Sequence, residues 1–493
     1  MRSNIRNLII VAVCIAVLGG ALLTLKLTGN DQAASSSVSS TASIELVSKK
    51  SEDVVSMNVV NQKGSYTLVP VKTPAASSKA SSGSSSAASG GTEPTYTVKE
   101  LGGCPINTSS TESVVKNGFS LVASKNLGTV GDLEEYGLKN PQATVKVQFR
   151  DGSSYDYKIG RASATDSASY YMCGLDSDHV YIVSVDQGLL ESPTYFVSTN
   201  ILAVNNTAAS SASGASENNF TKITLSGSNY PKPITFSVYQ TGLKISSPAN
   251  YTADSSKLDS LKTDLATLTA DSVEAVNPDA DALKKYGFDS PTAVAKYTVN
   301  GADYTLTAGA KDGADYYVML GGVNVVYKVA STSIQSWALG NLFDLRDKQL
   351  VGANIESVKS ITVDAGSGEN VLNVTRTKDE KQSTEDKAYY NYKVTGNGGK
   401  ALDYDTNFRN FFVKLVNINI LENAEEKPSG QPVLTVKFQY YDGAAADTFE
   451  FYKSGDRRYT AVVNGQVFGI VTQDDMDSVT AGISALESGK SVS

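Results

Sequence analysis

The sequence contains few of the residue types from which enzyme active sites are commonly built. Its 493 residues include one histidine, one tryptophan and three cysteines. Histidine is the usual base beside a serine or cysteine nucleophile, and histidine and cysteine are the usual zinc ligands. No glycine-rich phosphate loop, Cys-x-x-Cys pair or His-Glu zinc motif occurs in the sequence. We therefore expect no enzymatic activity, no cofactor and no metal site.

Basic residues are also in the minority. Lysine and arginine together number 43 against 51 aspartate and glutamate residues, which gives a net charge of −8. Proteins that bind nucleic acid carry clusters of basic residues that neutralise phosphates. The sequence has no such cluster, so we expect no nucleic-acid partner.

Long apolar runs are confined to the amino terminus. Residues 8–25 are apolar apart from glycine and Thr24, and a helix of that length nearly spans a hydrocarbon core of about 30 Å. Arg2 and Arg6 precede the run, which predicts a cytoplasmic amino terminus and an extracytoplasmic remainder. The alternative is a signal peptide cleaved near residues 19–21, which leaves a secreted protein.

A short motif repeats along the rest of the chain and defines its expected folding unit. Tyr-Gly-x-x-x-Pro ends at Pro141 and again at Pro291, and a degenerate version occurs near Gln431. Alternating apolar and polar residues around Asp-Gly or Asn-Gly follow each complete copy, and this pattern predicts β-hairpins. Internal repetition of this kind indicates tandem structural units.

Each unit also contains a helix candidate before the motif. The clearest has Leu258, Leu261, Leu265 and Leu268 on one helical face. We therefore expect an α+β fold of three tandem repeats. Each repeat is an antiparallel β-sheet of hairpins packed with one main helix, and all three follow an N-terminal transmembrane helix.

Composition places the expected boundaries. Residues 1–28 form the membrane anchor and residues 29–43 a Ser-rich stalk, and a Ser/Ala/Gly linker separates the first two repeats. The expected repeats and intervening segments are 44–205 with a disordered insertion at 73–94, a linker at 206–218, 219–351, and the degenerate copy 352–486.

Two cysteines and one histidine remain as candidates for chemistry. Cys104 and Cys173 lie outside the apolar run, and an exported pair meets conditions that permit a disulfide; two buried free thiols are the alternative. His179 follows Asp176 and Asp178 in a predicted turn, where it is interpreted as a solvated turn residue. The two aspartates lack the glycine and distal glutamate of a calcium loop.

Tyrosine is abundant, with 26 residues. Tyr170 and Tyr171 recur in register as Tyr316 and Tyr317, and strand alternation turns at least one ring of each pair inward. Strand packing explains such rings, but tyrosine is also enriched at interfaces. All four tyrosines are therefore candidate contacts for a partner or ligand.

The order of these motifs resembles the bacterial domain of unknown function 4340 family. Residues 133–160 and 170–183 carry the resemblance best, followed by 283–309 and 316–329, whereas residues 423–430 replace the Tyr-Gly motif in the third copy. The resemblance implies an outward-facing, membrane-anchored protein, often encoded near export-type ABC transporter components and without an assigned activity or cofactor.

Three functions follow as expectations. The leading one is an extracytoplasmic binding or scaffold protein, accessory to an ABC-type export or transport complex, with membrane transport components as partners. The second is a cell-surface module that binds cell-envelope polymer, either wall glycan or peptide, through Tyr-lined grooves. The third is a hydrolase that uses carboxylates from different units.

Overall fold

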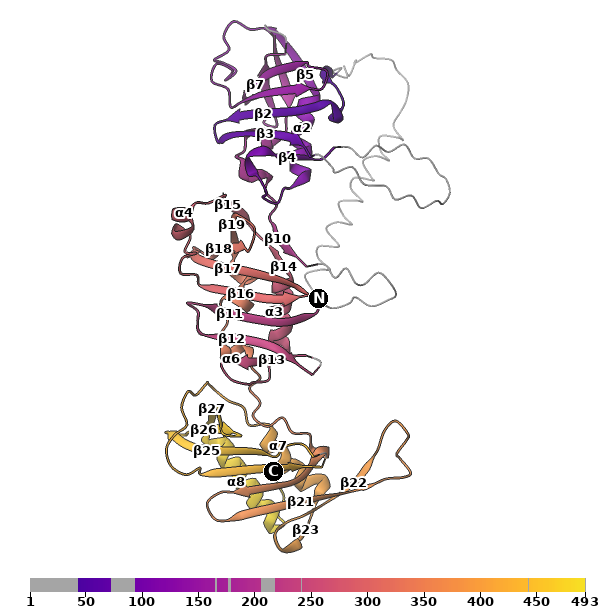
Figure 1. Ribbon diagram of the computed structural model, residues 1–493, viewed down its shortest axis with the longest axis vertical. Coiled ribbons are helices and arrows are strands. Elements are labelled where there is room, and N and C mark those ends of the chain that lie inside the picture. Colours follow the sequence, from indigo (N-terminus) through magenta and orange to yellow (C-terminus); the bar gives the residue numbers. More distant parts are fainter. Residues whose placement is uncertain are drawn as a thin grey trace, which may run out of the picture. The chain divides into compact units, whose positions relative to one another are not determined.

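The computed structural model describes most of the chain after residue 42 (Figure 1). The expected anchor at 8–25, the stalk at 29–43, the insertion at 73–94 and the linker at 206–218 lie outside the described residues except at single ends. No helix among the described residues has the length and apolar character needed to cross a membrane. The described ranges are 43–71, 94–164, 166–175, 179–204, 218–240, 242–441 and 443–492.

The expected α+β class behind a transmembrane helix is wrong. The structure is 46% strand and 22% helical, and its sheets are all antiparallel. The helix candidates were real but short: α3, Ser255–Ala266, has 12 residues and α7, Arg409–Val416, has 8. Two helices rather than one main helix accompany the third large sheet. Strands therefore make up more of the chain than helices do.

The chain forms two compact units. The first joins residues 1–97 to 112–192, and the second joins 98–111 to 193–493. A nine-stranded sheet belongs to the first unit, in the order β1-β5-β9-β8-β7-β6-β2-β3-β4. Helix α2, Thr108–Phe119, leads into β5. The strands are β1 Ile44–Ser48, β2 Val54–Asn61, β3 Gly64–Pro70, β4 Tyr96–Val98, β5 Ser120–Thr129, β6 Ala143–Phe149, β7 Ser154–Ala162, β8 Ser169–Cys173 and β9 His179–Ser184.

The second unit contains a two-stranded sheet and two eight-stranded sheets. β10, Asn200–Ala203, pairs with β14, Thr267–Thr269. The first eight-stranded sheet comprises β11 Phe220–Gly227, β12 Tyr230–Tyr239, β13 Gly242–Ser247, β15 Ser272–Val276, β16 Ala293–Val299, β17 Ala302–Asp312, β18 Asp315–Leu320 and β19 Val325–Ala330. Its helices are α3, α4 Ala280–Lys285, α5 Gln335–Ala338 and α6 Leu342–Leu345.

The second eight-stranded sheet follows directly along the chain, and α7 and α8 lie together against it (Figure 1). Phe411 and Phe412 of α7 and Ile483 of α8 are buried in one cluster with the sheet. The elements are β20 Val358–Asp364, β21 Glu369–Lys378, β22 Tyr390–Thr395, β23 Ala401–Leu402, β24 Leu434–Tyr440, β25 Asp447–Gly455, β26 Arg458–Val463, β27 Gln466–Thr472 and α8 Gln473–Ser488.

Short helical turns connect many of these strands. The one that matters most for the candidate site is η3, Gln187–Leu190, which follows β9. The others are Ser51–Asp53, Lys99–Leu101, Pro193–Phe196, Ser331–Ser333, Ile355–Ser357, Asn397–Gly399 and Tyr404–Phe408.

The three large sheets share one strand order over most of their width. The order runs β4-β3-β2-β6-β7-β8-β9-β5 in the first, β13-β12-β11-β16-β17-β18-β19-β15 in the second, and β22-β21-β20-β24-β25-β26-β27 in the third. Most neighbouring strands are also consecutive along the chain, except that the outer pairs β5–β9 and β15–β19 join strands about 50 residues apart. The central pairs, β2–β6, β11–β16 and β20–β24, also join strands distant in sequence, so each sheet closes only when its early and late halves meet.

The Tyr-Gly motif packs its backbone against β7, the second strand of the β6–β7 hairpin that follows the motif. The Arg161 N–H donates to the carbonyl oxygen of Tyr136, at 3.0 Å. Gly137 has a positive φ of 69°, and a Cβ there would lie 2.8 Å from the Arg161 nitrogen. A Cβ at Gly160 would clash with the Tyr136 oxygen. Glycine is required at both positions because the two backbones are in contact.

The second copy repeats this arrangement. The Ala310 N–H donates to the Tyr286 oxygen, at 2.8 Å, and a Cβ at Gly309 would clash with that oxygen. The third sheet forms without the motif. There Ile470 N–H donates to the oxygen of Glu422, at 3.0 Å, beside Gly469.

A buried arginine lies between the two eight-stranded sheets of the second unit. Arg346 has no exposed surface, and its guanidinium carbon lies 3.7 Å from the ring centre of Tyr251 and 4.1 Å from that of Phe468. Its Nη1 donates to the Phe468 oxygen, at 2.6 Å. Burial lowers the pKa of Arg346 to about 10. The contacts of this side chain therefore join Tyr251, which follows the edge strand β13 of one sheet, to Phe468 in the edge strand β27 of the other.

The close approach at the Tyr-Gly motif predicts an unequal cost for two matched glycine substitutions. Gly287 has φ +80° with a Cβ position 2.6 Å from the Ala310 nitrogen, whereas Gly301 has φ +79° and open space around it. We expect Gly287→Ala to lower the free energy of unfolding by about 2–4 kcal/mol, and Gly301→Ala by about 1–2 kcal/mol. Denaturant unfolding of the full chain measures both. Equal losses would contradict the proposed contact.

Candidate functional site

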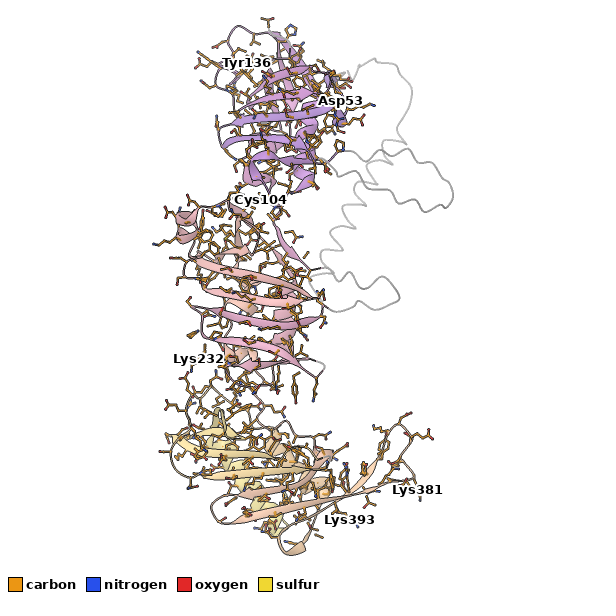
Figure 2. All side chains as sticks on the ribbon, viewed as in Figure 1. Asp53, Cys104, Tyr136, Lys232, Lys381 and Lys393 are labelled. Atoms are coloured by element: carbon orange, nitrogen blue, oxygen red, sulfur yellow. The ribbon has the colours of Figure 1, made fainter. Side chains whose placement is uncertain are left out.

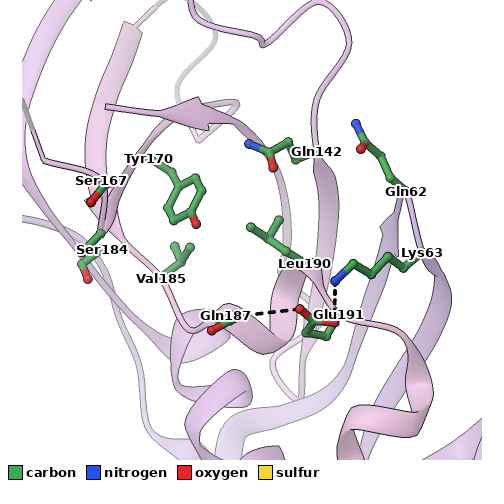
Figure 3. A pocket seen from close by; sticks show the side chains of 11 residues that line it. Gln62, Lys63, Gln142, Ser167, Tyr170, Ser184, Val185, Gln187, Leu190 and Glu191 are labelled. Atoms are coloured by element: carbon green, nitrogen blue, oxygen red, sulfur yellow. Dashed lines mark hydrogen bonds and ion pairs between the residues drawn. The ribbon is translucent and has the colours of Figure 1, made fainter. Parts of the chain in front are cut away.

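A hollow of about 530 Å³ opens in the first unit at the ends of its interior strands (Figure 3). The turn between β2 and β3, the residue before β6, the start of β8, the end of β9 and η3 all contribute to its walls. We call it the Tyr170 hollow. Its principal lining residues are Gln62, Gln142, Tyr170, Val185, Leu190 and Glu191.

Backbone-directed hydrogen bonds hold the floor of the hollow in place. The Asn61 amide donates to the carbonyl oxygens of Leu189 and Glu191, at 3.0 and 2.8 Å. The hydroxyl of the buried Tyr66 donates to the oxygen of Gly188, at 2.6 Å. These bonds fix η3 against the β2–β3 hairpin, so the walls of the hollow belong to one packed structure.

The charged groups at the hollow neutralise each other. Lys63 Nζ lies 2.6 Å from Glu191 Oε2, and Gln187 donates to Glu191 Oε1 at 3.4 Å (Figure 3). Among the described residues, Glu191 is the only carboxylate that lines the hollow. Because it is held in an ion pair, the hollow presents no unpaired charge to a ligand.

Several polar side chains in the walls remain open to a ligand. Those of Gln62, Ser167, Tyr170 and Ser184 make no hydrogen bond with any residue that the structure describes. Gln142 donates to the oxygen of Gly160, at 2.7 Å, and this leaves its own amide oxygen without a partner in the described chain. The hollow therefore offers hydroxyl and amide groups that both donate and accept.

The first predicted tyrosine pair divides between the hollow and the core. Tyr170 is half-buried and lines the hollow. Tyr171 is 8% exposed and packs edge-on against Tyr136, with ring centres 4.9 Å apart (Figure 2 labels Tyr136). Tyr171 therefore supports the Tyr-Gly turn, and a ligand in the hollow meets Tyr170.

The second pair lines no comparable hollow among the described residues. Tyr316 is buried, at 9% exposure. Tyr317 is half-buried, its ring centre lies 4.7 Å from that of Tyr286, and its hydroxyl donates to Asp312 at 3.1 Å. The structure thus distinguishes Tyr170 from the other three candidate contacts.

Both candidate cysteines are free thiols in the structure. Cys104 (Figure 2) is buried and Cys173 is half-buried, and burial raises the pKa of both. They belong to different compact units, since Cys104 lies within 98–111. Their disulfide stays a prediction.

The histidine and the two aspartates predicted to share a turn are the remaining candidates from the sequence. His179 is the first residue of β9, and its Nδ1 lies 3.1 Å from the Asn126 amide nitrogen, so its interpretation as a turn residue is wrong. Asp176 and Asp178 lie outside the described residues. Within the described ranges, no group of three or more histidine, cysteine, aspartate or glutamate side chains is arranged to hold a metal ion.

One described carboxylate has a raised pKa. Burial raises the pKa of Asp264, which lines a separate hollow of about 270 Å³ in the second unit together with Asp344 and Lys257. This hollow is where the hydrolase expected as the third function would have its carboxylates. No carboxylate from another sheet joins these residues in the hollow's lining.

Most residues of the Tyr170 hollow could not be predicted from the sequence. Gln62, Gln142, Leu190 and Glu191 come from separate loops and carry no motif. The only usable signal was the repeated Tyr-Tyr pair on β8.

The comparisons with known proteins give a family and no activity. A family model described as a domain of unknown function, DUF4340, matches residues 97–237 and 244–431. No curated protein and no solved structure matches the chain. The two matched stretches together exceed half of the chain.

Large pKa shifts at tyrosines reflect core packing and lead to a testable effect at high pH. Tyr327 is fully buried, its hydroxyl has no hydrogen-bond partner among the described residues, and burial raises its pKa from 10.0 to about 12. The stability due to this neutral side chain is complete below pH 10 and is lost as the pH rises through about 12.

Tyr327→Phe should therefore raise the free energy of unfolding by about 1 kcal/mol at neutral pH, because it removes an unsatisfied hydroxyl. The variant should also lose less stability than the parent between pH 10 and about 12. Tyr230→Phe is the matched control, since the Tyr230 hydroxyl donates to the Trp337 oxygen at 2.9 Å, and it should cost about 1 kcal/mol. Denaturant unfolding across this pH range measures both. A loss of stability in Tyr327→Phe at neutral pH would contradict the assignment.

Proposed function

The chain belongs to the DUF4340 family of domains of unknown function. We propose that it is an extracytoplasmic binding module for a polar, uncharged ligand. The observation that carries this proposal is the Tyr170 hollow. It combines a half-buried aromatic ring, open hydroxyl and amide groups and a neutralised ion pair.

The size and lining of the hollow support binding. Pockets that hold small ligands typically measure about 300–1,000 Å³ and combine apolar surface with a few placed polar groups. The hollow, at about 530 Å³, falls within this range, and Tyr170, Val185 and Leu190 supply its apolar surface. A charged ligand would have to break the Lys63–Glu191 pair or remain unpaired, so an uncharged ligand fits best.

Binding without catalysis is the better proposal for this hollow. Glu191 is its only lining carboxylate, and the contact of 2.6 Å with Lys63 keeps it in an ion pair. A general acid or base must be free to exchange a proton with the substrate. The lining residues supply no second acid that would act with Glu191.

The location and the neighbours of the protein rest on the sequence. The apolar run at 8–25 with Arg2 and Arg6 before it supports a membrane-anchored chain whose bulk is extracytoplasmic. The family resemblance supports membrane transport components as neighbours. A rigid ligand-binding hollow is compatible with a module that holds a ligand beside such a complex.

The proposal predicts a specific effect of removing one ring. Tyr170→Ala should weaken binding of an uncharged polar ligand by about tenfold, since loss of a contacting aromatic ring costs about 1.4 kcal/mol. Tyr317→Ala is the control, because Tyr317 is similarly half-buried and does not line the hollow. Calorimetric titration of the full-length chain with neutral oligosaccharides and neutral peptides measures both. Equal losses in the two variants would contradict the proposal.

Salt provides an independent check. Because the hollow has no unpaired charge, affinity should change by less than about twofold between low and physiological salt. Glu191→Gln should retain binding of the neutral ligand, since the new amide still accepts from Gln187, and should add affinity for anions through the released Lys63. A steep salt dependence in the parent chain would show that the ligand is charged.

A further inference from the structure

We infer that the ligand of the Tyr170 hollow is a glycan segment whose sugar ring stacks on Tyr170. This inference rests on the proposed binding function and specifies the class of ligand. It is based on the apolar strip in the hollow, on the chemistry of its open polar groups and on the pairing of the surrounding strands.

The apolar part of the hollow is a short strip beside the tyrosine ring. Tyr170, Val185 and Leu190 face the same space (Figure 3). A pyranose ring has one face of C–H groups and an edge of hydroxyl groups, so it is apolar on one side and polar around it. An aromatic ring provides a matching flat surface, and the open Tyr170 hydroxyl can hydrogen-bond with a sugar hydroxyl.

The polar groups of the hollow are a better match for the hydroxyls of a sugar than for a ligand that is charged or that only accepts hydrogen bonds. The open side chains of Gln62, Ser167 and Ser184, together with the Gln142 amide oxygen, include both donors and acceptors. A sugar hydroxyl likewise donates one hydrogen bond and accepts others. These groups come from different loops around the strip, so they can contact hydroxyls on several sides of one ring.

Peptide binding fits this hollow less well because no strand edge is available. Extended peptides commonly bind by adding a strand to the free edge of a sheet. β2, β3, β6, β8 and β9, whose ends surround the hollow, each have a neighbouring strand on both sides. These strands are therefore not edge strands of the sheet, and the paired Lys63 and Glu191 offer no free charge for a peptide terminus.

The experiment compares two probes on the full-length chain, solubilised in a mild detergent. The probes are an N-acetylglucosamine oligomer and a neutral, end-blocked oligopeptide of similar size, and calorimetry measures their affinities. We expect the sugar oligomer to bind and the peptide not to bind. Tyr170→Phe, which keeps the flat ring, should stay within about threefold of the parent, whereas Tyr170→Leu should lose about tenfold.

The outcomes separate this inference from the proposed function. Tyr170-dependent binding of the peptide without binding of the sugar would overturn the glycan inference and leave the proposed binding function standing. Binding of neither probe, or equal losses in Tyr170→Leu and the control Tyr317→Ala, would overturn both. Equal weakening by Tyr170→Phe and Tyr170→Leu would show that ring stacking is not the mode of recognition. The thermal unfolding temperature of each variant verifies that it is folded.

Discussion

The turn that carries Tyr136 and Gly137 lies so close to β7 that neither Gly137 nor Gly160 has room for a side chain. This contact sets the path of the chain into β6, because Pro141 and Gln142 follow the turn directly. It also positions the candidate site, since the Gln142 amide donates to the Gly160 oxygen and then lines the Tyr170 hollow. The Tyr-Gly motif is therefore structural, and it helps to shape the hollow through Gln142, the residue that follows it.

The family matches and the sheets divide the chain differently. The stretch 97–237 contains β5 to β9 of the first sheet together with β11 and most of β12 of the next, and 244–431 continues in the same manner. In the pairs β2–β6 and β20–β24, one strand lies inside a matched stretch and the other lies outside it. In the pair β11–β16, the two strands lie in different matched stretches. A sequence repeat of this family is thus not one complete sheet. Each sheet needs strands contributed by two neighbouring stretches of the chain.

The electrostatics of the described chain are mainly those of a packed β protein. Burial raises the pKa of many tyrosines and lowers that of Arg346, and these groups lie in cores or between sheets. At the Tyr170 hollow, by contrast, the charged group is a carboxylate, Glu191, which is paired with Lys63. The uncharged ligand proposed for this hollow would be recognised through shape and hydrogen bonding. A glycan in the cell envelope meets this description and the expected location of the protein.

Local features followed from the sequence by itself. Asn300 and Gly301 both have positive φ, as a two-residue hairpin turn requires. Of the four leucines that predicted a helix, Leu258, Leu261 and Leu265 lie in α3, whereas Leu268 lies in β14. These features involve residues close together in the sequence, so residue propensity and the spacing of apolar residues were sufficient to predict them. The predicted α+β class was wrong because hydrophobic periodicity locates a helix but does not show how much of the chain the strands around it occupy. Only the tertiary structure decided which of the four candidate tyrosines lines the hollow. The reason is that the hollow is assembled from loops separated by more than a hundred residues, as the Lys63–Glu191 pair shows with a separation of 128.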